Sequence, residues 1–372
     1  MSLPSNAALA PGSLILVTGA NGFLGTHVVD RLLTYGFRVR GKQTDGCDPW
    51  ALETVSKWPD ATQRLSLVRC TVRDTTKNAW IKDHFQQKYG ADKFELVEAK
   101  DLGVEGALDD AVKGCDGVMH VASDLSFSPD PNVVVNNAVN FTTVALNSAA
   151  KEASVKRFVL TSSSAAAVPG TLNEPYDLTQ DSWATQQIEA AWKAPPYEQE
   201  RMVIVYAASK AQAEQAMWKF VEDRKPQFVA NSVLPDFICG SPYNLEKQGY
   251  GPSNGALVAL WNKNDFFKVL YPQWMIDVKD TADLHVAALI APDAKNERIF
   301  GFAHNKTWTD WIARLEKMYP SHDFPNPPEN EGIDMANVVG RDRAEGLLKW
   351  LGKDGWRPME ESMKEVCDTL VV

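Results

Sequence analysis

The sequence predicts an α/β fold, in which a doubly wound parallel sheet is joined to a smaller mixed C-terminal domain. The first observation is an apolar run, Leu14 to Val17, that leads through glycines 19, 22 and 25 into helically spaced apolar residues over 26–34. The second is that strand-like and helix-like segments alternate from there to Thr161. The third is that several strand-like segments end in small or polar residues, where the ligands of parallel sheets bind.

Composition narrows the classes of protein that the chain can belong to. The 372 residues are 44% hydrophobic and 23% charged, as in a globular protein with a sizeable core. The formal net charge of −10 makes nucleic acid an improbable partner. No basic, apolar leader and no stretch of about 20 apolar residues is present, so we expect neither secretion nor a membrane span. The five cysteines show no C-x-x-C spacing, so we expect no metal site and a reducing, cytoplasmic location.

Taken in order, the patterns predict two connected domains. Residues 12–235 form the expected sheet domain, and residues 236–372 form a mainly substrate-binding domain that is partly interleaved with it. Strands are expected at 14–18, 37–40, 70–74, 94–97, 117–122, 157–161 and 228–234. Helices are expected at 26–34, 79–89, 103–113, 133–153 and 211–224, and beyond Pro235 near 256–261, 281–291, 309–318 and 359–370. Residues 169–200 are polar and irregular.

The turn after the first strand predicts a pyrophosphate site. Gly19 permits a tight turn, Gly22 lets a phosphate approach the backbone, and Gly25 lets the helix pack close to the strand. Backbone N–H groups and the positive end of the helix dipole would hold the phosphates. The alternative is a glycine-rich β–α turn without a function.

One segment interrupts this pattern. Gly41 to Arg69 has neither a helical nor a strand period, and a connection of this length is unusual in α/β units. Its removal would join Phe37–Arg40 directly to Cys70 in one strand, and Val-Arg occurs at both of its edges. We interpret it as foreign to the fold, such as a retained intron or a misjoined gene model; a real surface loop is the alternative, which transcript sequencing would decide.

Tyr206 and Lys210 carry the expected chemistry. Their i, i+4 spacing places both on one face of a helix. An ammonium near a phenol stabilises the phenolate and brings the phenol pKa closer to neutrality, so that the phenol can protonate a carbonyl oxygen. A serine at a strand end would hold the same oxygen, and we choose Ser163 over Ser162. His120 lies within a strand and is expected to be a core residue.

With these residues in place, the sequence resembles the extended short-chain dehydrogenases/reductases, which have a Rossmann-type sheet. The resemblance rests on T-G-A-N-G-F-L-G (18–25), D-G-V-M-H-V-A-S (116–123), R-F-V-L-T-S-S (157–163) and Y-A-A-S-K (206–210). It is strongest to fungal NADPH-dependent aldehyde and carbonyl reductases, relatives of the plant dihydroflavonol reductases. The resemblance implies a catalytic triad of Ser163, Tyr206 and Lys210. It further implies these cofactor contacts: Gly19, Asn21, Gly22, Phe23, Leu24 and Gly25 for the pyrophosphate; Asp101 and Leu102 for the adenine; Val121, Ala122, Ser123, Tyr206 and Lys210 near the nicotinamide ribose; and Pro235 for the carboxamide.

The choice of cofactor depends on the end of the second strand, where a basic residue accommodates the 2′-phosphate of NADP. Thr71-Val-Arg-Asp-Thr-Thr-Lys77 resembles the family pattern there, so Arg73 and Lys77 are the expected phosphate ligands. If the 41–69 segment displaces them, Arg40 and Lys42 become the rivals. The expected cofactor is therefore NADP(H).

The sequence thus predicts an NADPH-dependent reductase of an aldehyde or ketone, a monomer or homodimer whose partner is a small carbonyl compound. Substrate contacts are expected from residues 124–127, 169–172 and the loop after Pro235. Two other classes stay open. One is a sugar-nucleotide epimerase or dehydratase that retains NAD, and the other is a non-catalytic regulator that senses NADP.

Overall fold

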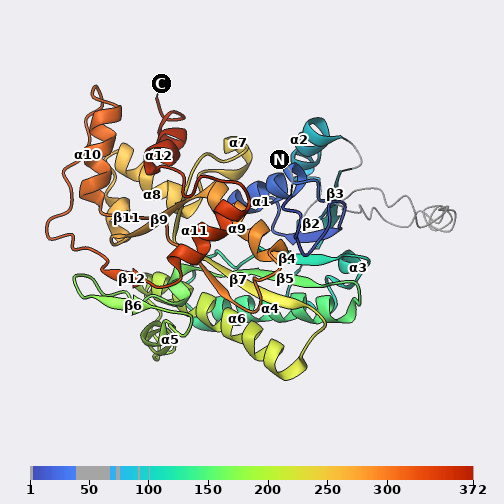
Figure 1. Ribbon diagram of the computed structural model, residues 1–372. Helices are drawn as coiled ribbons and strands as arrows, with labels where there is room; N and C mark the ends of the chain where they lie inside the picture. The colour runs from blue at the N-terminus through green and yellow to red at the C-terminus, as the bar shows by residue number, and fades with distance from the viewer. Residues whose placement is uncertain (1–2, 39–67, 73–75, 91–92, 100, 372) are drawn as a thin grey trace.

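The computed structural model of the 372-residue chain describes residues 3–38, 68–72, 76–90, 93–99 and 101–371 (Figure 1). Residues 41–67 of the interrupting segment 41–69 lie outside these residues, as do the rival ligands Arg40 and Lys42 and the expected phosphate ligand Arg73. All statements below concern the described part of the chain.

Seven strands of the described chain form one parallel sheet in the order β3-β2-β1-β4-β5-β7-β10. Their bounds are β1 Ile15–Thr18, β2 Val68–Val72, β3 Phe94–Glu98, β4 Gly117–His120, β5 Arg157–Thr161, β7 Val229–Pro235 and β10 Arg298–Gly301. In chain order, β2 and β3 lie on one side of β1, and β4 then lies on the other side of β1. The direction of winding therefore reverses between β1 and β4, which is where sheets of this kind bind their ligands. The predicted Rossmann-type fold is confirmed.

Helices cover both faces of this sheet (Figure 1). One face carries α1 (Phe23–Thr34), α9 (Val278–Ile290) and α11 (Arg341–Trp350), and the other carries α4 (Pro131–Lys151) and α6 (Met202–Arg224). Strand β1 shows why: Ile15 and Val17 belong to the core under α1 and α9, whereas Leu16 belongs to the core under α4 and α6. Alternate residues of a strand point to opposite faces, so a run that is apolar at every position requires cover on both.

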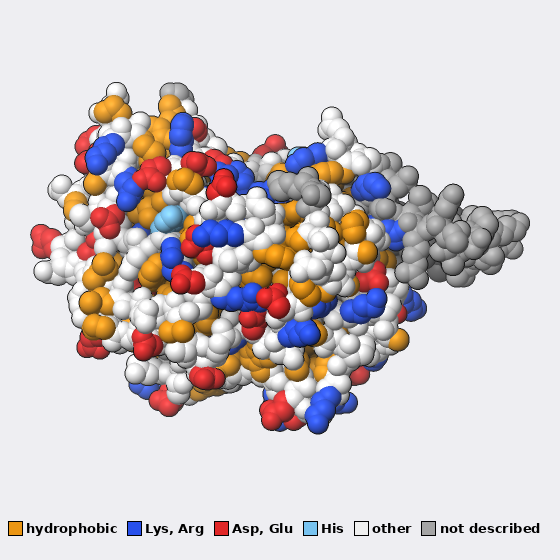
Figure 2. Space-filling view, in the orientation of Figure 1, with side chains coloured by type: hydrophobic (Ala, Val, Ile, Leu, Met, Phe, Trp, Pro, Cys, Tyr) orange, Lys and Arg blue, Asp and Glu red, His pale blue; other side chains and the backbone are white. Residues whose placement is uncertain are grey.

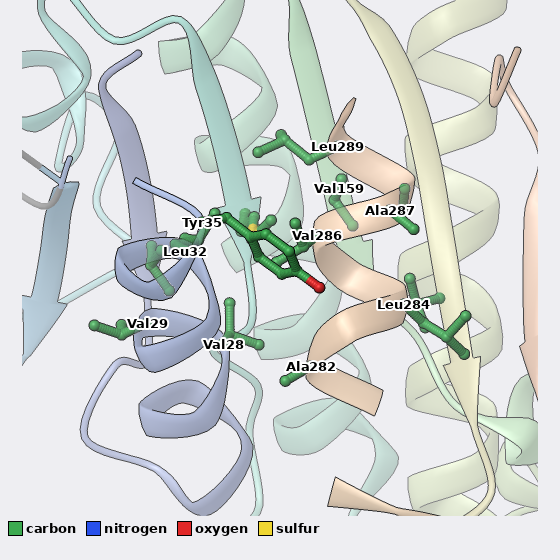
Figure 3. Packing of buried hydrophobic residues seen from close by; sticks show 14 of the residues in the cluster. Val28, Val29, Leu32, Tyr35, Val159, Ala282, Leu284, Val286, Ala287 and Leu289 are labelled. Atoms are coloured by element: carbon green, nitrogen blue, oxygen red, sulfur yellow. The ribbon is translucent and has the colours of Figure 1, made fainter. Parts of the chain in front are cut away.

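The contact between α1 and α9 illustrates this packing (Figure 3). Val28 and Leu32 of α1 point toward Val286 of α9, and all three are fully buried. Burying a side chain of this size contributes about 1.5–3 kcal/mol, so this contact holds α9, from the C-terminal half, against the first helix of the chain.

The C-terminal half also builds a smaller, mixed layer. Strands β8 (Phe237–Cys239), β9 (Gln273–Asp277) and β11 (His304–Lys306) form a three-stranded sheet that has one parallel and one antiparallel pair. It shares a core with α8 (Gly251–Trp261), α10 (Trp308–Met318) and α12 (Met359–Cys367). Because β10 lies in the large sheet, this half of the chain contributes to both layers. The division at residue 235 stays a prediction.

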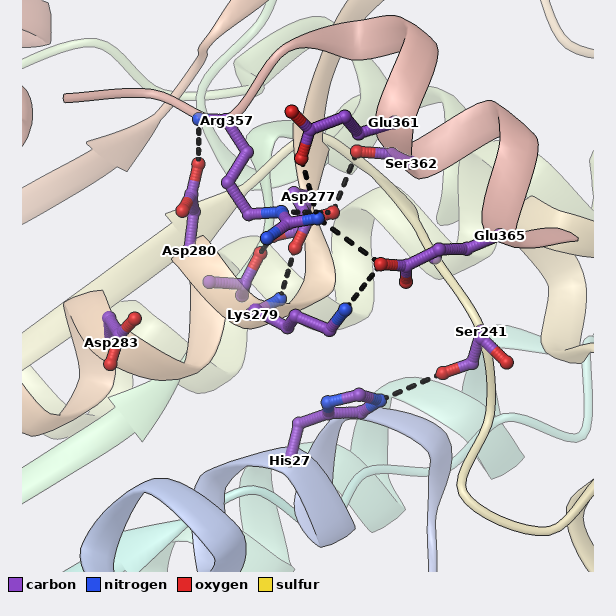
Figure 4. A network of polar contacts seen from close by, with 12 residues as sticks. His27, Ser241, Asp277, Lys279, Asp280, Asp283, Arg357, Glu361, Ser362 and Glu365 are labelled. Atoms are coloured by element: carbon purple, nitrogen blue, oxygen red, sulfur yellow. Dashed lines mark hydrogen bonds and ion pairs between the residues drawn. The ribbon is translucent and has the colours of Figure 1, made fainter. Parts of the chain in front are cut away.

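A polar network fastens α12 to the start of α9 (Figure 4). Asp277 caps α9 by accepting a hydrogen bond from the Lys279 N–H, and it also accepts one from Ser362 of α12 over 2.7 Å. The Arg357 guanidinium lies 3.2 Å from the same carboxylate. The buried charge of Asp277 is thus paired and hydrogen-bonded, as a buried carboxylate requires.

The pairing of β1 with its neighbour locates the interruption seen in the sequence. Leu14 pairs with Arg38, 24 positions later, in parallel orientation, and Leu16 pairs with Arg69, 53 positions later. The two offsets differ by 29 residues, which is the length of Gly41 to Arg69. Arg69 therefore occupies the place beside Leu16 that an uninterrupted strand from Arg38 would give to Arg40. The expected strand 37–40 is described only to Arg38, and β2 supplies the rest of that position in the sheet.

Three expectations about elements differ from the structure. The predicted helix 103–113 is present only as α3 (Asp109–Val112), because Gly106 has a φ of +78° that breaks any earlier helix. The residues 169–200, expected to be irregular, contain β6 (Tyr176–Leu178) and α5 (Thr185–Ala191), and β6 pairs with β12 (Ala336–Val338). The edge strand β10 was not predicted, although Ile299 and Phe300 mark an apolar run. The remaining short elements are α2 (Ala79–Tyr89) and α7 (Leu245–Gln248).

Acidic and basic side chains are interspersed over the face shown in Figure 2, without a continuous basic surface. Such a surface offers no stripe of positive charge for a phosphate backbone. Within the described residues, no helix has both the length and the apolar composition needed to cross a bilayer.

Candidate active site

A cavity of about 500 Å³ opens at the carboxyl ends of β1, β4, β5 and β7. A cavity at the carboxyl ends of the strands was predicted, and the strand order places it at the reversal in winding. Predicted site residues that line it are Gly19, Asn21, Gly22, Phe23, Leu24, Gly25, Leu102, Val121, Ala122, Ser123, Ser163, Tyr206, Lys210 and Pro235.

The glycine turn at one end of the cavity is a cradle that admits no side chain at two positions. Gly19 has a φ of +70°, and a Cβ there would lie 2.9 Å from the Ala122 backbone. A Cβ on Gly25 would lie 2.1 Å from the carbonyl oxygen of Gly19. The turn is closed by the Gly22 N–H, which donates to the same carbonyl over 3.0 Å. These clashes explain the glycines by close packing of the turn, and the turn itself lines the cavity at the N-terminus of α1, the arrangement that binds phosphate.

Tyr206 and Lys210 reach the cavity from the first half of α6, one helical turn apart. The Lys210 ammonium donates to the carbonyl oxygen of Thr161 over 2.9 Å and to the Ser123 hydroxyl over 3.4 Å. Burial lowers the pKa of Lys210 to about 8, against the opposing effect of Glu214. The lysine therefore joins the ends of β4 and β5 and carries a charge in neutral solution.

Tyr206 keeps its proton in this arrangement. Burial raises the pKa of the phenol, a hydrogen bond with the Ser163 hydroxyl lowers it, and the charge of Asp236 raises it again. The sequence argument expected Lys210 to lower this pKa, but the ammonium is directed at Thr161 and Ser123 instead. A phenol that retains its proton is the form that can donate one. The ring of Phe127 lies against Tyr206, with centroids 5.5 Å apart.

Ser163 follows β5 and caps the short 3₁₀ turn Ser164–Ala166, where its hydroxyl accepts from the Ala165 N–H over 3.2 Å. Ser162, the alternative considered from the sequence, donates to Glu214 over 2.7 Å and is thereby engaged in the interior. The structure thus brings Ser163 rather than Ser162 to the phenol of Tyr206.

Glu214 lies one turn beyond Lys210 on α6 and is fully buried. Its carboxylate accepts hydrogen bonds from Ser162, Ser232 and Trp218 and forms an ion pair with Arg298 of β10 over 2.8 Å. Such a complete set of partners is what a buried charge requires. Nothing in the one-dimensional pattern distinguishes this glutamate from a surface helix residue.

Some predicted residues do not line the cavity. Lys77 and Asp101 are exposed, and the Asp101 carboxylate accepts from the Gly103 N–H over 2.8 Å in a surface turn. The expected substrate segment 169–172 also lies outside the lining. His120 is buried in β4, 3.0 Å from Thr18, and burial lowers its pKa to about 3. It is a core residue, as expected.

The sequence analysis expected substrate contacts from the loop after Pro235 but did not single out two polar residues that follow Pro235. Asp236 follows Pro235 and lines the cavity, and burial raises the pKa of its carboxyl to about 7. Gln248 of α7 donates to the carbonyl oxygens of Asn21 and Gly22 and to the Thr26 hydroxyl, each over 3.1 Å. An acid directly after a buried strand could have pointed to the first, but only the fold brings Gln248 to the glycine turn.

A second set of contacts holds the segment that leads into α7 close to α1. The His27 ring donates through Nε2 to the carbonyl oxygen of Ser241 over 3.0 Å (Figure 4). His27 also packs against the ring of Tyr243, with centroids 4.6 Å apart. Residues 241–248 are thus fastened over the start of α1, beside the glycine turn.

The strand order and the glycine cradle define a doubly wound protein of the dinucleotide-binding type. Residues 15–233 match the NAD dependent epimerase/dehydratase family, and the chain belongs to this family. It is 36% identical to aldehyde reductase 2 of Sporidiobolus salmonicolor, with 98% of each chain covered. It is 33% identical to ketoreductase adrE of Penicillium rubens, again over 98% of both chains.

Among solved structures, the chain resembles yeast methylglyoxal/isovaleraldehyde reductase Gre2 complexed with NADPH. The TM-score is 0.71 and the identity 22%, over 96% of this chain and 98% of that chain. Vestitone reductase from alfalfa gives a TM-score of 0.68 at 19% identity, over 96% and 97% of the two chains. At these identities the likeness concerns the fold.

Proposed function

We propose that the protein reduces an aldehyde or ketone to an alcohol with NADPH. The observation that supports this most strongly is that Ser163, Tyr206 and Lys210 line the same cavity as the glycine cradle. The family relatives named aldehyde reductase and ketoreductase agree with this chemistry.

The glycine turn would hold the pyrophosphate of a dinucleotide, because its residues line the cavity at the N-terminus of α1, where backbone N–H groups and the helix dipole attract anions. Leu102, Ser123, Lys210 and Pro235 would contact the adenosine, ribose and carboxamide parts. NADPH bound there supplies the hydride that the carbonyl carbon receives. The protein supplies position and a proton.

The proton would come from Tyr206. Its phenol and the Ser163 hydroxyl, already hydrogen-bonded to one another, would both bind the carbonyl oxygen. As negative charge develops on that oxygen, Tyr206 donates its proton. Lys210, held by Thr161 and Ser123 one helical turn from Tyr206, would contribute its positive charge to the wall of the cavity in which the phenolate forms. A positioned acid of this kind contributes about 10²–10⁴ in rate.

The preference for NADPH would rest on Arg73 and Lys77. Lys77 precedes α2, and the residue is exposed at the surface. The variant Lys77→Ala should raise the KM for NADPH several-fold and leave that for NADH unchanged, because only NADPH carries the 2′-phosphate. Lys82→Ala, an exposed lysine farther along α2, is the matched control.

The proposal is tested by following oxidation of NADPH and of NADH with a panel of aldehydes and ketones. We expect turnover with several compounds and a preference for NADPH. NAD that stays tightly bound through purification, with no carbonyl-dependent turnover, would favour an epimerase or dehydratase instead. Binding of NADPH without turnover of any compound would favour a sensor.

A further inference from the structure

The cavity contains one acidic side chain that the reduction just described does not use. Asp236 follows the last residue of β7 and is 8% exposed, and it lines the cavity together with Tyr206. Its place is fixed by backbone, because its own N–H donates to the Gly301 carbonyl over 3.2 Å. The backbone of Asp236 is therefore anchored to β10, and the residue forms part of the cavity wall.

Hydrogen bonds within the protein use only part of the acceptor capacity of the Asp236 carboxyl group. Oδ2 accepts from the Trp274 N–H over 3.2 Å, and the Ser164 hydroxyl provides a second hydrogen bond. Among the described residues, no lysine, arginine or histidine forms an ion pair with it. A carboxylate has about four lone-pair sites, so acceptor capacity remains. Buried acids are usually paired, which makes an unpaired one in a cavity wall a candidate for ligand binding.

The nearest buried cation does not fill this role. Lys306 of β11 is fully buried, but its Nζ lies over the rings of Phe237 and Trp308, 4.6 and 4.0 Å from their centroids. It has no hydrogen-bond partner. Its charge acts on Asp236 through space, without a direct contact. The open side of the carboxyl is therefore left to the cavity.

The walls around this carboxyl are apolar. Leu125, Phe127, Phe237 and Leu270 line the same cavity, which suits an aromatic or aliphatic body. Binding pockets commonly combine such walls with a few placed polar groups that decide which ligand is accepted.

We propose that Asp236 binds a hydrogen-bond donor of the substrate, so that the preferred substrates are aldehydes or ketones with an apolar body and a hydroxyl or amino group away from the carbonyl. This inference rests on the proposed function and adds the class of substrate. Asp236 would act in selection, while Ser163, Tyr206 and Lys210 carry out the reduction.

The charge state of the carboxyl agrees with this role. Burial raises its pKa to about 7, Ser164 lowers it, and the charge of Asp334 raises it. The charge of Asp236 in turn acts to raise the pKa values of Tyr206, Tyr271 and Lys306. At pH 8 the carboxylate predominates, and a carboxylate accepts hydrogen bonds but cannot donate them.

The test compares four aryl ketones that are alike except for one distal substituent, which is hydrogen, hydroxyl, methoxy or amino. The methoxy compound keeps the acceptor oxygen of the hydroxyl compound, has no donor and is one methyl group larger. For the wild-type protein at pH 8, we expect kcat/KM to be about 10-fold or more higher for the hydroxyl or amino compound than for methoxy, the worth of one charge-assisted hydrogen bond. Which of the two compounds is preferred distinguishes an alcohol from an amine as the natural donor.

The variant Asp236→Asn keeps an acceptor for the Trp274 N–H but removes the charge. It should lower the hydroxyl-to-methoxy ratio of kcat/KM about 10-fold. The ratio is taken within each variant, because the charge of Asp236 also acts on the pKa of Tyr206 and its removal can change kcat/KM for every ketone. Asp334→Asn is the control: this acid belongs to the same buried cluster, accepts from Tyr176 over 3.0 Å and does not line the cavity. Circular dichroism and NADPH titration confirm that each variant is folded.

The outcomes separate the two proposals. A wild-type protein without preference for a donor, or a ratio that Asp236→Asn leaves unchanged, overturns the inference while the reduction itself stands. A fall in kcat/KM by the same factor for all four ketones means that Asp236 only orders the turn at Trp274, and this also overturns it. Inactivity of the wild-type protein on every ketone overturns the proposed function, and the inference with it.

Discussion

The ammonium of Lys210 donates a hydrogen bond to the carbonyl oxygen of Thr161 over 2.9 Å and thereby ties the middle of α6 to the last residue of β5. Tyr206 lies one turn before Lys210, and Ser163 lies two residues after Thr161. One contact therefore holds together the two elements that bring the phenol and the serine hydroxyl to the cavity. A lysine in this position both carries charge and fixes geometry.

The role of the Lys210 charge can be tested by replacing this lysine and measuring how activity depends on pH. In Lys210→Met the ammonium is lost at every pH, and kcat should fall about 100-fold or more, because a charge beside a forming phenolate is worth several kcal/mol. In the wild-type protein, kcat/KM for reduction should fall as pH rises above about 8, where buried Lys210 loses its proton. The pH profile of kcat/KM measures both effects. Lys219→Met, an exposed lysine of the same helix, should leave the profile unchanged; a Lys210→Met profile that keeps the wild-type fall near pH 8 would contradict the assignment.

Glu214 is predicted to support the stability of the fold. Its ion pair with Arg298 joins α6 to the edge strand β10 with both side chains at most 4% exposed. Glu214→Ala leaves a buried guanidinium unpaired and should reduce the free energy of unfolding by about 3–5 kcal/mol, measured by urea denaturation. Asp223→Ala breaks the exposed pair with Lys219 and should cost about 0–1 kcal/mol. Equal effects of the two substitutions would mean that the buried pair contributes no more than a surface pair.

Gln248 is predicted to hold the glycine turn in the form that binds the cofactor. Gln248→Ala removes its hydrogen bonds to Asn21, Gly22 and Thr26, and each is worth about 1 kcal/mol. The dissociation constant for NADPH should therefore rise about 10-fold, as measured by fluorescence titration. The matched variant Lys247→Ala alters a neighbour that contacts only Glu246 through its side chain and should bind NADPH normally. Identical constants for the two variants would show that the turn is rigid without Gln248.

Deletion of Gly41 to Arg69 tests the strand register. Since Arg69 takes the position beside Leu16 that Arg40 would have, removing 29 residues should leave β1 and its neighbour correctly paired. Closing a loop of this length costs about 2 kcal/mol more than a short turn, so the deleted chain should be more stable by about that amount. NADPH affinity should be kept or increased, because Arg73 then follows Gly25 by the usual distance.

A deletion that is one residue longer, Gly41 to Cys70, is the control. A shift of one residue turns every side chain of a strand to the opposite face, so this chain should be strongly destabilised. Thermal unfolding and NADPH titration of both deleted chains give the comparison. If the two deletions are equally damaging, the register argument is wrong and the segment is part of the fold.

The elements around the glycine turn could be predicted because their signals are local. Leu14 to Val17 is apolar at every position, and helically spaced apolar residues follow directly. The predicted strand and helix therefore agree with β1 and α1 to within a few residues. The order of strands and the place of the cavity then follow from general rules for parallel sheets.

The parts that could not be predicted depend on contacts between distant residues. Gln248 meets the glycine turn, about 225 positions earlier, only after the chain has folded. Lys210 was expected to act on Tyr206 and on the nicotinamide ribose, and its bond to Thr161 appears only when α6 packs beside β5. Short strands such as β6 and β12 pair with residues 160 positions away and carry no independent signal.

The most direct measurement is a comparison of the wild-type protein with Tyr206→Phe in a single-turnover reaction with NADPH and a reducible ketone. Phenylalanine keeps the ring that packs on Phe127 and removes only the proton donor. We expect the rate of NADPH oxidation to fall by about 10²–10⁴ while the dissociation constant for NADPH changes by less than about 2-fold. A Tyr206→Phe protein that binds NADPH and oxidises it at the wild-type rate would show that Tyr206 is not the acid.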